Sequence, residues 1–451
     1  MKATINLRQQ TPMWHFQADT AGCVLRATEV KPKLDKFLRT QEKLDKSWFV
    51  KGREDALDYK LWFVAPDGCP SELKSQHYPL FFGNMGGGQQ KKLIFYKEAI
   101  EMHLFSLNDA LIGCIKRHLF EFFATHSFGT RQDKGFGFFF PVEIDGIKKE
   151  DFDQAFGAHY QFEFNWESYD DKFQNSRNGP PYSSWEHKFV EMFMAIHYFH
   201  KLIRSGINER GRYYKSLMYH YARKKGLQWD KPTIRHHFQF YTKTYQSICG
   251  QLTPFHEDVF HKKNGEVKKK TYYSREGMKQ EYRTNKKSNL LFRDALGLAS
   301  EQQWMAYKDV ISVKAEDEDF ARFKSPILYR PVILEEEGKC RVYIHWDESS
   351  LTDLKAQFFT ISHHPQKDRL EDPHPQDEIS SLEQMQVYSE FSLKEYFDYI
   401  STYYEGLRKR YERDRRTRMG RGKQDNSYIT GIFQLDQENF RAVITPNTPK
   451  P

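Results

Sequence analysis

The chain has 451 residues, of which 39% are hydrophobic and 29% charged, and its formal net charge is +8. No apolar run is long enough to span a bilayer and the first residues do not read as a secretory signal, which argues against a membrane or secreted protein. Aromatic residues make up 16% of the chain, and surplus cations together with aromatic rings favour an RNA-like partner, because cations attract phosphates and rings stack on bases.

The first third of the chain predicts a mixed α/β domain. Ile5 and Leu7 alternate with polar residues as in a half-buried strand. Apolar residues then recur at helical spacing in two segments, and Ser106 is placed to cap the second helix. This order of elements is typical of a ferredoxin-like or RRM-like sheet with helices on one face. The predicted strands cover residues 1–10, 92–96, 135–144 and 159–166, and the predicted helices cover 28–44 and 106–123.

The rest of the chain predicts a helical middle followed by a return to strands. Ser183 and Glu186 form a capping box before a helical apolar pattern, and another capping box opens a long helix near Ser392. We expect an α+β fold with two ferredoxin-like, RRM-like domains and helical insertions. The expected divisions are an N-terminal domain over 1–165, a mostly helical region over 166–310, and a divergent α+β region over 311–451 with a mobile linker near 363–378 and a basic C-terminal helix.

The sequence offers no convincing active site. His197 and His200 lie three residues apart on a predicted helix, but no nearby acidic residue completes a metal site. Nucleotide-binding and hydrolase motifs are missing. We therefore predict no catalytic residue, no metal and no cofactor. The cysteines are dispersed, which is typical of a protein of the reducing cytoplasm; they are Cys23, Cys69, Cys114, Cys249 and Cys340.

The stretch HSFGTRQDKGFGFFF, residues 126–140, is the strongest local signal. Its glycines permit positive φ angles and close backbone approach, and successive N–H groups in such a loop can face a phosphate oxygen. A flexible connector from helix to strand explains the same spacing equally well. On the first interpretation, the candidate RNA-binding residues are Gly129, Arg131, Lys134, Gly135 and Gly137.

Several segments resemble a known family. Residues 128–137 are similar to the glycine-rich loop of the RAMP superfamily of CRISPR-associated proteins, and residues 80–96 are similar to a second segment of that superfamily. Residues 322–333 resemble a Ser-Pro-x-hydrophobic-x-basic-Pro segment found in relatives. Together these ordered matches identify the chain as similar to RAMP proteins.

The opening of the chain resembles one subfamily. Residues 11–38 are similar to the start of the twin-domain head subunit of type III-B (Cmr-type) effectors, and Arg26 and Lys31 occupy its basic positions. Pro32 stands where that subfamily usually has glycine. A helix start after Arg26 would add affinity for anions, so both cations join the candidate RNA-binding residues. The alternative is a surface pair of cations that binds no partner.

The resemblance implies a non-catalytic subunit of a type III CRISPR antiviral interference complex in the cytoplasm. Its partners would be CRISPR RNA and other RAMP subunits, with contact to target RNA left open. Most RNA contacts would be to the backbone, because the protein must accept variable guide sequences. Two alternatives remain: a metal-independent endoribonuclease that matures CRISPR RNA, with His126 or His15 as acid or base, and a scaffold whose cations are only solvated.

The predicted C-terminal helix ends in a basic segment. Residues 407–423 hold nine Lys or Arg against Glu412 and Asp414, a local charge of +7. Such a segment repels itself until a polyanion neutralises it. We therefore predict that Arg415, Arg416 and Arg418 bind RNA or an acidic neighbouring subunit, the alternative being a frayed, solvated end.

Overall fold

The computed structural model describes parts of both predicted domains. None of the helices in these ranges combines the length and apolar character that a bilayer crossing needs. The described ranges are 1–14, 25–65, 71–73, 93–148, 160–165, 184–209, 212–227, 229–230, 234, 254–261, 267–273, 290–297, 302–306, 309–317, 323–334, 339–364, 382–402 and 445–446.

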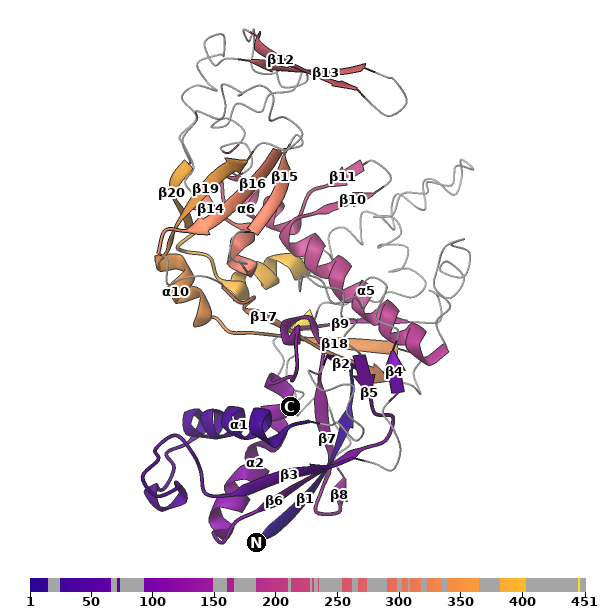
Figure 1. Ribbon diagram of the computed structural model, residues 1–451, viewed down its shortest axis with the longest axis vertical. Coiled ribbons are helices and arrows are strands. Elements are labelled where there is room, and N and C mark those ends of the chain that lie inside the picture. Colours follow the sequence, from indigo (N-terminus) through magenta and orange to yellow (C-terminus); the bar gives the residue numbers. More distant parts are fainter. Residues whose placement is uncertain are drawn as a thin grey trace.

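The first unit is a five-stranded antiparallel sheet in the order β3-β6-β1-β7-β8, with two helices on one face (Figure 1). Numbered along the chain, the first four strands stand in the spatial order 2-3-1-4, which is that of a ferredoxin-like βαββαβ domain. The elements are β1 (Lys2–Gln9), α1 (Ala27–Gln41), β3 (Lys60–Val64), β6 (Ile100–Phe105), α2 (Asp109–Thr125), β7 (Phe139–Ile144) and β8 (Ile147–Lys148).

Alternation and helical spacing place the core of this unit as the sequence predicted. Ile5 and Leu7 of β1 point into the core and are fully buried. Both helices turn an apolar stripe toward the sheet, with Leu34 and Leu38 on α1 and Ile115 on α2 buried. Burial of such stripes against a sheet is what stabilises helices of this length.

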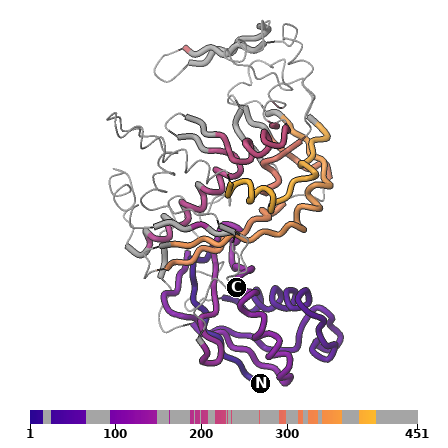
Figure 2. The backbone as a smooth tube through the Cα atoms, turned by 180° about the vertical axis from the view of Figure 1, so that it is seen from behind, coloured from indigo at the N-terminus to yellow at the C-terminus, as the bar shows by residue number. Residues whose placement is uncertain are grey.

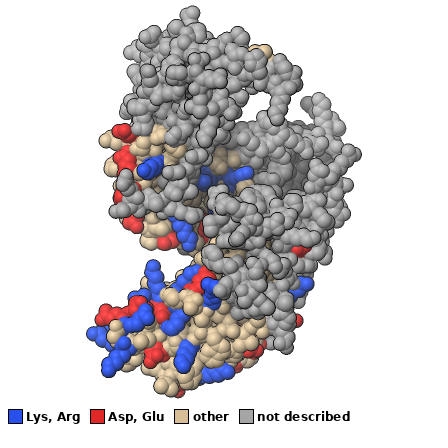
Figure 3. Space-filling model, in the orientation of Figure 1, with Lys and Arg blue, Asp and Glu red and all other residues tan. Residues whose placement is uncertain are grey.

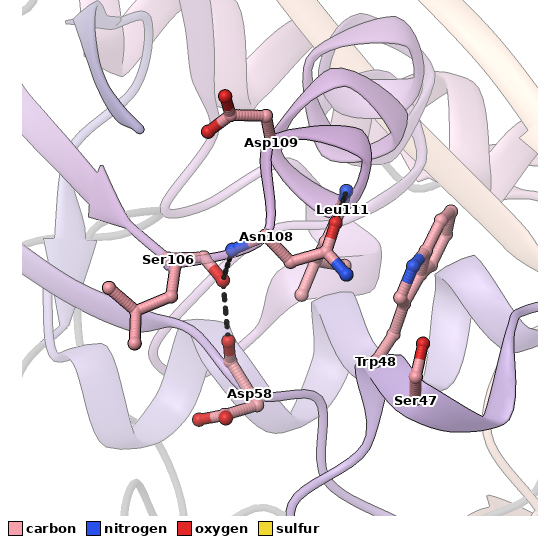
Figure 4. Close-up of a pocket in the computed structure, with 8 residues that line it drawn as sticks. Ser47, Trp48, Asp58, Ser106, Asn108, Asp109 and Leu111 are labelled. Carbon is pink, nitrogen blue, oxygen red and sulfur yellow. Dashed lines mark hydrogen bonds between the residues drawn. The ribbon is translucent and has the colours of Figure 1, made fainter.

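The start of α2 differs from the prediction. Asn108, and not Ser106, caps the helix, because the Asn108 side chain accepts from the N–H of Leu111 at 3.1 Å. Ser106 instead donates to the carbonyl of Asp58 at 2.8 Å and accepts from the N–H of Asn108 at 3.1 Å (Figure 4). A pocket of about 430 Å³ opens beside this cap and is lined by Ser47, Trp48, Asp58, Ser106, Leu107, Asn108, Asp109 and Leu111.

The second unit repeats the arrangement of the first. Its antiparallel sheet has the order β17-β18-β9-β21, and in chain order a helix follows β9 and another precedes β21, which again gives the order 2-3-1-4. Its elements are β9 (Tyr160–Asn165), α5 (Ser184–Arg204), β17 (Ile327–Leu334), β18 (Lys339–Trp346), the helical residues 393–402, and β21 (Thr445–Pro446). The predicted α+β fold with two domains of this type is confirmed.

Insertions extend both units. A five-stranded sheet, β14-β20-β19-β16-β15, packs beside the second unit (Figures 1 and 2). The hairpin β12-β13 projects at the end farthest from the first unit in Figure 1. The insertions consist of β2 (Met13–Trp14), η1 (Lys46–Trp48), β4 (Ser71–Leu73), β5 (Leu93–Phe95), β10 (Ile207–Glu209), β11 (Arg212–Tyr214), α6 (Leu217–Lys224), β12 (Pro254–His261), β13 (Val267–Tyr273), β14 (Leu290–Leu291), η3 (Arg293–Leu296), β15 (Gln302–Ala306), β16 (Asp309–Ala315), α10 (Ser350–Ala356), β19 (Phe358–His364) and β20 (Leu382–Val387).

Two predicted boundaries fall on strands. β9 closes the range predicted for the first domain, and it hydrogen-bonds to β18 of the second sheet over residues 160–165. The range predicted as a linker begins inside β19, which pairs with β16 as far as His364. Residues 365–378 of that range lie outside the described residues.

Candidate functional site

The glycine loop, residues 126–138 between α2 and β7, lies where the two units meet. Phe128 and Phe138 belong to the hydrophobic core of the first unit. Phe136 belongs to the core of the second, where its ring stacks on Phe193 of α5 with a centroid distance of 3.8 Å and an interplanar angle of 8°. The loop therefore fastens the two cores to each other and is more than a connector between α2 and β7.

Close packing explains why glycine is needed in the loop. At Gly129, with φ +77°, an added Cβ would lie 2.3 Å from the carbonyl oxygen of Trp14. At Gly137, with φ +64°, the Cβ would lie 1.8 Å from the carbonyl oxygen of Phe128. Both positions combine a left-handed backbone with no space for a side chain.

The amides of the loop glycines are bonded within the protein. Gly129 donates to Oε1 of Glu29 at 3.0 Å, Gly137 donates to the carbonyl of Pro12 at 2.9 Å, and Gly135 donates to the carbonyl of Gln132 at 3.2 Å. A phosphate at this loop would therefore meet its cationic side chains rather than these three N–H groups.

The two cations predicted in the loop are both anchored. The Arg131 guanidinium lies 5.0 Å from the centroid of the Phe136 ring. Lys134 Nζ donates to Nε2 of His200 at 3.2 Å and lies 3.6 Å from the Asp133 carboxylate, while 30% of the Lys134 side chain stays exposed. Burial of the ammonium lowers the pKa of Lys134. Both cations are held in fixed positions, which reduces the entropy lost when they bind an anion.

Arg330 of β17 holds the loop from the side of the second unit. It is 1% exposed and donates to the carbonyls of Ala124 at 2.9 Å and Thr125 at 2.7 Å, the last residues of α2. A third bond of 3.4 Å reaches the carbonyl of Gln132 in the loop. A cation at the C-terminal end of a helix satisfies carbonyls that have no partner inside the helix. The basic position of the Ser-Pro-containing segment was the sequence signal for this residue, although its role was not predicted.

Helix α1 brings a cation to the loop that the sequence did not single out. Lys33 Nζ donates to Oε1 of Glu29 at 3.2 Å and to the carbonyl of Ser127 at 3.1 Å, and it lies 4.8 Å from the Phe128 ring centroid. The first turn of α1 thus rests on the loop. Arg26 is the N-cap residue of this helix and its side chain makes no capping bond.

Lys31 points away from the loop. Its ammonium donates to Oδ2 of the buried Asp35 at 2.9 Å and to the carbonyl of Leu57 at 2.7 Å, and it lies 3.9 Å from the Tyr59 ring centroid. Residues two apart on a helix project in nearly opposite directions, so Lys33 reaches the loop and Lys31 does not. In this structure Lys31 serves to neutralise a buried carboxylate.

A notch separates the first unit from the rest of the molecule on the face shown in Figure 3, and Lys and Arg side chains lie on both sides of it. Lys324, in the segment that leads into β17, is exposed. Partial burial of its ammonium group nonetheless lowers the pKa of Lys324. The positive charges of Arg330 and Lys33 lower it further, while the negative charge of Asp133 raises it. Asp133 belongs to the glycine loop, and Lys33 and Arg330 bond to carbonyls of that loop, so these interactions place Lys324 close to the loop.

Three predicted RNA-binding residues and one candidate histidine belong to other parts of the chain. Arg415, Arg416 and Arg418 lie outside the described residues, as does His15. The structure thus brings the five loop residues and the start of α1, with Arg26, to one region, and adds Lys33, Lys324 and Arg330 to it.

His126 is the one candidate acid or base of the sequence analysis within the described ranges. Its Nδ1 lies 3.0 Å from the carbonyl of Phe122, and its ring stacks on that of Phe122 at 4.6 Å. Burial lowers the pKa of His126 to about 4, and the charges of Arg330 and Lys33 add to this effect. A histidine with so low a pKa is neutral at pH 7 and is a poor proton donor.

The low pKa predicts a loss of stability in acid. The ordinary pKa is 6.5 and the folded value about 4, so between these pH values the unfolded chain binds a proton that the folded chain excludes. The free energy of unfolding should therefore fall as the pH falls, with His126 contributing about 1–2 kcal/mol after partial exposure is allowed for.

Thermal unfolding measured between pH 7.5 and 4.5 checks this expectation against a His126→Asn variant. The Asn amide can still donate to the Phe122 carbonyl but does not titrate, so the melting temperature of the variant should fall less steeply with pH. Equal slopes in the two proteins would show that His126 is not protonated in this range.

Comparison with known proteins gives two matches along the sequence. The Cmr1 N-terminal domain matches residues 1–207 and the Cmr1 C-terminal domain matches residues 213–423. Among solved structures, the apo crystal structure of Cmr1 from Pyrococcus furiosus is similar at 11% identity and a TM-score of 0.31, over 85% of this chain and 94% of that chain. No curated protein matches the sequence.

Proposed function

The chain belongs to the Cmr1 family, whose members are RAMP subunits of type III-B CRISPR effector complexes, and on this premise we propose that it binds the guide RNA of such a complex without cleaving it. The proposed surface is the notch beside the glycine loop, and the proposed contacts are to RNA phosphates. Its other partners in this proposal are neighbouring RAMP subunits, with target RNA as a further candidate.

The observation that carries the proposal is the meeting of cations from three distant segments. Lys33 comes from α1, Arg131 and Lys134 from the loop, and Lys324 from the segment that leads into β17. The charges of Lys33, Lys324 and Arg330 act on one another or on His126. Like charges repel in the free protein, and a phosphate chain relieves that repulsion. Contacts to phosphates suit a guide whose base sequence varies.

The loop glycines and Lys31 support the surface indirectly in this proposal. Gly129, Gly135 and Gly137 let the loop pack closely enough to hold Arg131 and Lys134 in place. Lys31 fixes α1 through its bond to the carbonyl of Leu57, and Arg26 extends the surface at the N-terminus of that helix. The basic segment with Arg415, Arg416 and Arg418 remains a predicted second contact.

Geometry at His126 supports a binding role over the nuclease alternative. The ring is packed between Phe122 and Phe37, and a neutral imidazole whose Nδ1 is bonded to a carbonyl has one nitrogen left for chemistry. A general acid that completes RNA cleavage needs a pKa nearer to neutrality.

Guide-RNA binding by a charge-neutralised variant tests the proposal. Arg131→Gln combined with Lys324→Gln should weaken binding roughly ten-fold at 0.1 M salt and reduce the salt slope by about one to two units, equally for two unrelated guide sequences. Lys51→Gln with Lys60→Gln, which removes two exposed cations far from the loop, is the matched control and should bind like the wild type.

Two results would overturn the proposal. Unchanged affinity and salt slope in the loop variant would remove the notch from the RNA surface. Specific cleavage of a repeat-containing RNA in EDTA, abolished by His126→Ala, would replace the binding role with an endoribonuclease.

A further inference from the structure

Three potential metal ligands meet where the end of α1 approaches the middle of α2. Glu42 is the C-cap residue of α1, and Cys114 and His118 lie on α2. One ligand atom from each residue can be chosen so that all three lie within 4.8 Å of one another, the one such group among the described residues. The set combines a thiol, an imidazole and a carboxylate.

The spacing on α2 favours joint ligation. Cys114 and His118 are four residues apart, so both side chains project from the same face of the helix. Cys114 is fully buried, His118 keeps 20% of its side chain exposed and Glu42 keeps 37%. The thiol thus lies on the buried side of the group and the carboxylate on its solvent side. An ion can enter from the solvent side, where a water molecule can serve as a further ligand.

One distance within the group matches a tetrahedral zinc site, and a second is shorter. His118 Nε2 lies 3.6 Å from Glu42 Oε1, and bond lengths of about 2.0–2.3 Å to zinc imply about 3.3–3.5 Å between two ligand atoms. Cys114 Sγ lies 2.7 Å from the same Oε1, so Glu42 has to move outward by roughly 1 Å to admit the ion. Glu42 follows the last helical turn and is partly exposed, which permits that movement.

The other nitrogen of His118 has a carboxylate partner. Its Nδ1 lies 3.8 Å from Oε2 of Glu121, one turn further along α2, and the ring packs edge-on against Phe37 of α1 with centroids 6.4 Å apart. Histidines that bind metals commonly face a carboxylate with their second nitrogen, which orients the ring and strengthens it as a ligand.

We propose that Glu42, Cys114 and His118 bind one zinc ion, which joins the end of α1 to α2. Binding replaces the S–H bond of Cys114 with a sulfur–zinc bond and releases the proton to water, and water fills the fourth position. A mixed set of sulfur, nitrogen and oxygen ligands in this geometry suits zinc better than magnesium or calcium, which prefer oxygen ligands. The proposed role of the ion is to link the two helices, and none of its ligands is among the residues proposed to bind RNA.

Arg117 offers the competing explanation for Glu42. Its Nη2 lies 3.0 Å from Glu42 Oε1, so without an ion the carboxylate is part of a surface ion pair, and such pairs contribute little to stability. The two interpretations therefore predict different effects of removing Arg117. If the group is only an ion pair, Arg117 holds Glu42 in place; if it is a zinc site, Arg117 hinders zinc.

Metal titration of the full chain tests the proposal. The protein, stripped with chelator, should bind one equivalent of zinc at this site, and Co²⁺ should give the near-ultraviolet absorption of a thiolate–cobalt bond. Cys114→Ser and His118→Gln should each weaken zinc binding at least ten-fold, and Arg117→Gln should tighten it. Cys340→Ser, which changes the other described buried cysteine, is the control and should bind like the wild type.

Each outcome decides the question. Loss of the cobalt–thiolate signal in Cys114→Ser but not in Cys340→Ser, together with tighter zinc binding in Arg117→Gln, supports the site even if one ligand variant folds poorly. A wild-type chain that binds no zinc, or that binds it equally well after the changes at Cys114 and His118, overturns the proposal.

Discussion

Gly137→Ala should destabilise the protein by roughly 2–5 kcal/mol, because two costs combine at this position. A left-handed backbone costs a non-glycine residue about 1–2 kcal/mol, and forcing extra atoms into a packed interior costs about 1–3 kcal/mol more. The added Cβ would lie 1.8 Å from the Phe128 carbonyl oxygen, which is backbone and cannot rotate away. Urea denaturation followed by circular dichroism measures the loss.

Gly146→Ala is the matched control for this prediction. Gly146 has φ +83°, and nothing lies within 4 Å of a Cβ added there. The control variant therefore pays only the backbone cost of about 1–2 kcal/mol. If the two variants lose equal stability, the close approach of Gly137 to Phe128 does not exist in solution.

Arg330→Met should cost about 3–5 kcal/mol and should also loosen the joint between the two units. Methionine keeps much of the volume but removes the donor from the carbonyls of Ala124, which is buried, and Thr125, which is half-buried. Removal of a buried cation also leaves the Asp133 charge, which acts on Arg330, less compensated. Thermal unfolding gives the loss, and limited proteolysis between residues 126 and 138 reports the loosened loop.

Two further variants test whether the charge of Arg330 or the hydrogen bonds of its guanidinium stabilise the loop. Arg330→Lys keeps the charge but cannot reach three carbonyls at once, so it should recover only a small part of the lost stability. Arg341→Met removes a partly exposed arginine from the neighbouring strand β18 and should change stability by less than about 1 kcal/mol. Full recovery in Arg330→Lys would mean that the hydrogen bonds of the guanidinium do not hold the loop.

The sequence predicted the elements of the first unit because the signals for them are local. Alternation at Ile5 and Leu7 and helical spacing along α1 and α2 reflect contacts that each element makes with one core. Glycines at positive φ likewise leave a local mark, since few other residues adopt that backbone. These signals placed the glycine loop between a helix and a strand, and the resemblance of its motif led to the right family.

Which lysine of α1 lies at the glycine loop could not be predicted in the same way. Arg26 and Lys31 followed from a motif, but the structure brings Lys33 to the loop and binds Lys31 to Asp35. Which face of a helix meets a loop about 100 residues later depends on how the helix docks on the sheet. The burial of Phe136 in the core of the second unit depends in the same way on the packing of α5.

What the sequence by itself determined about this protein is its class: an α+β chain of two similar domains, rich in cations, with a glycine-rich loop between a helix and a strand. Tertiary structure alone decided which charges stand together. Arg330 lies 206 residues from the carbonyl it binds in α2, and Cys114 lies 72 residues from Glu42. Contacts at such separations form only when the sheets and helices have packed, so no periodicity or spacing within a short segment encodes them.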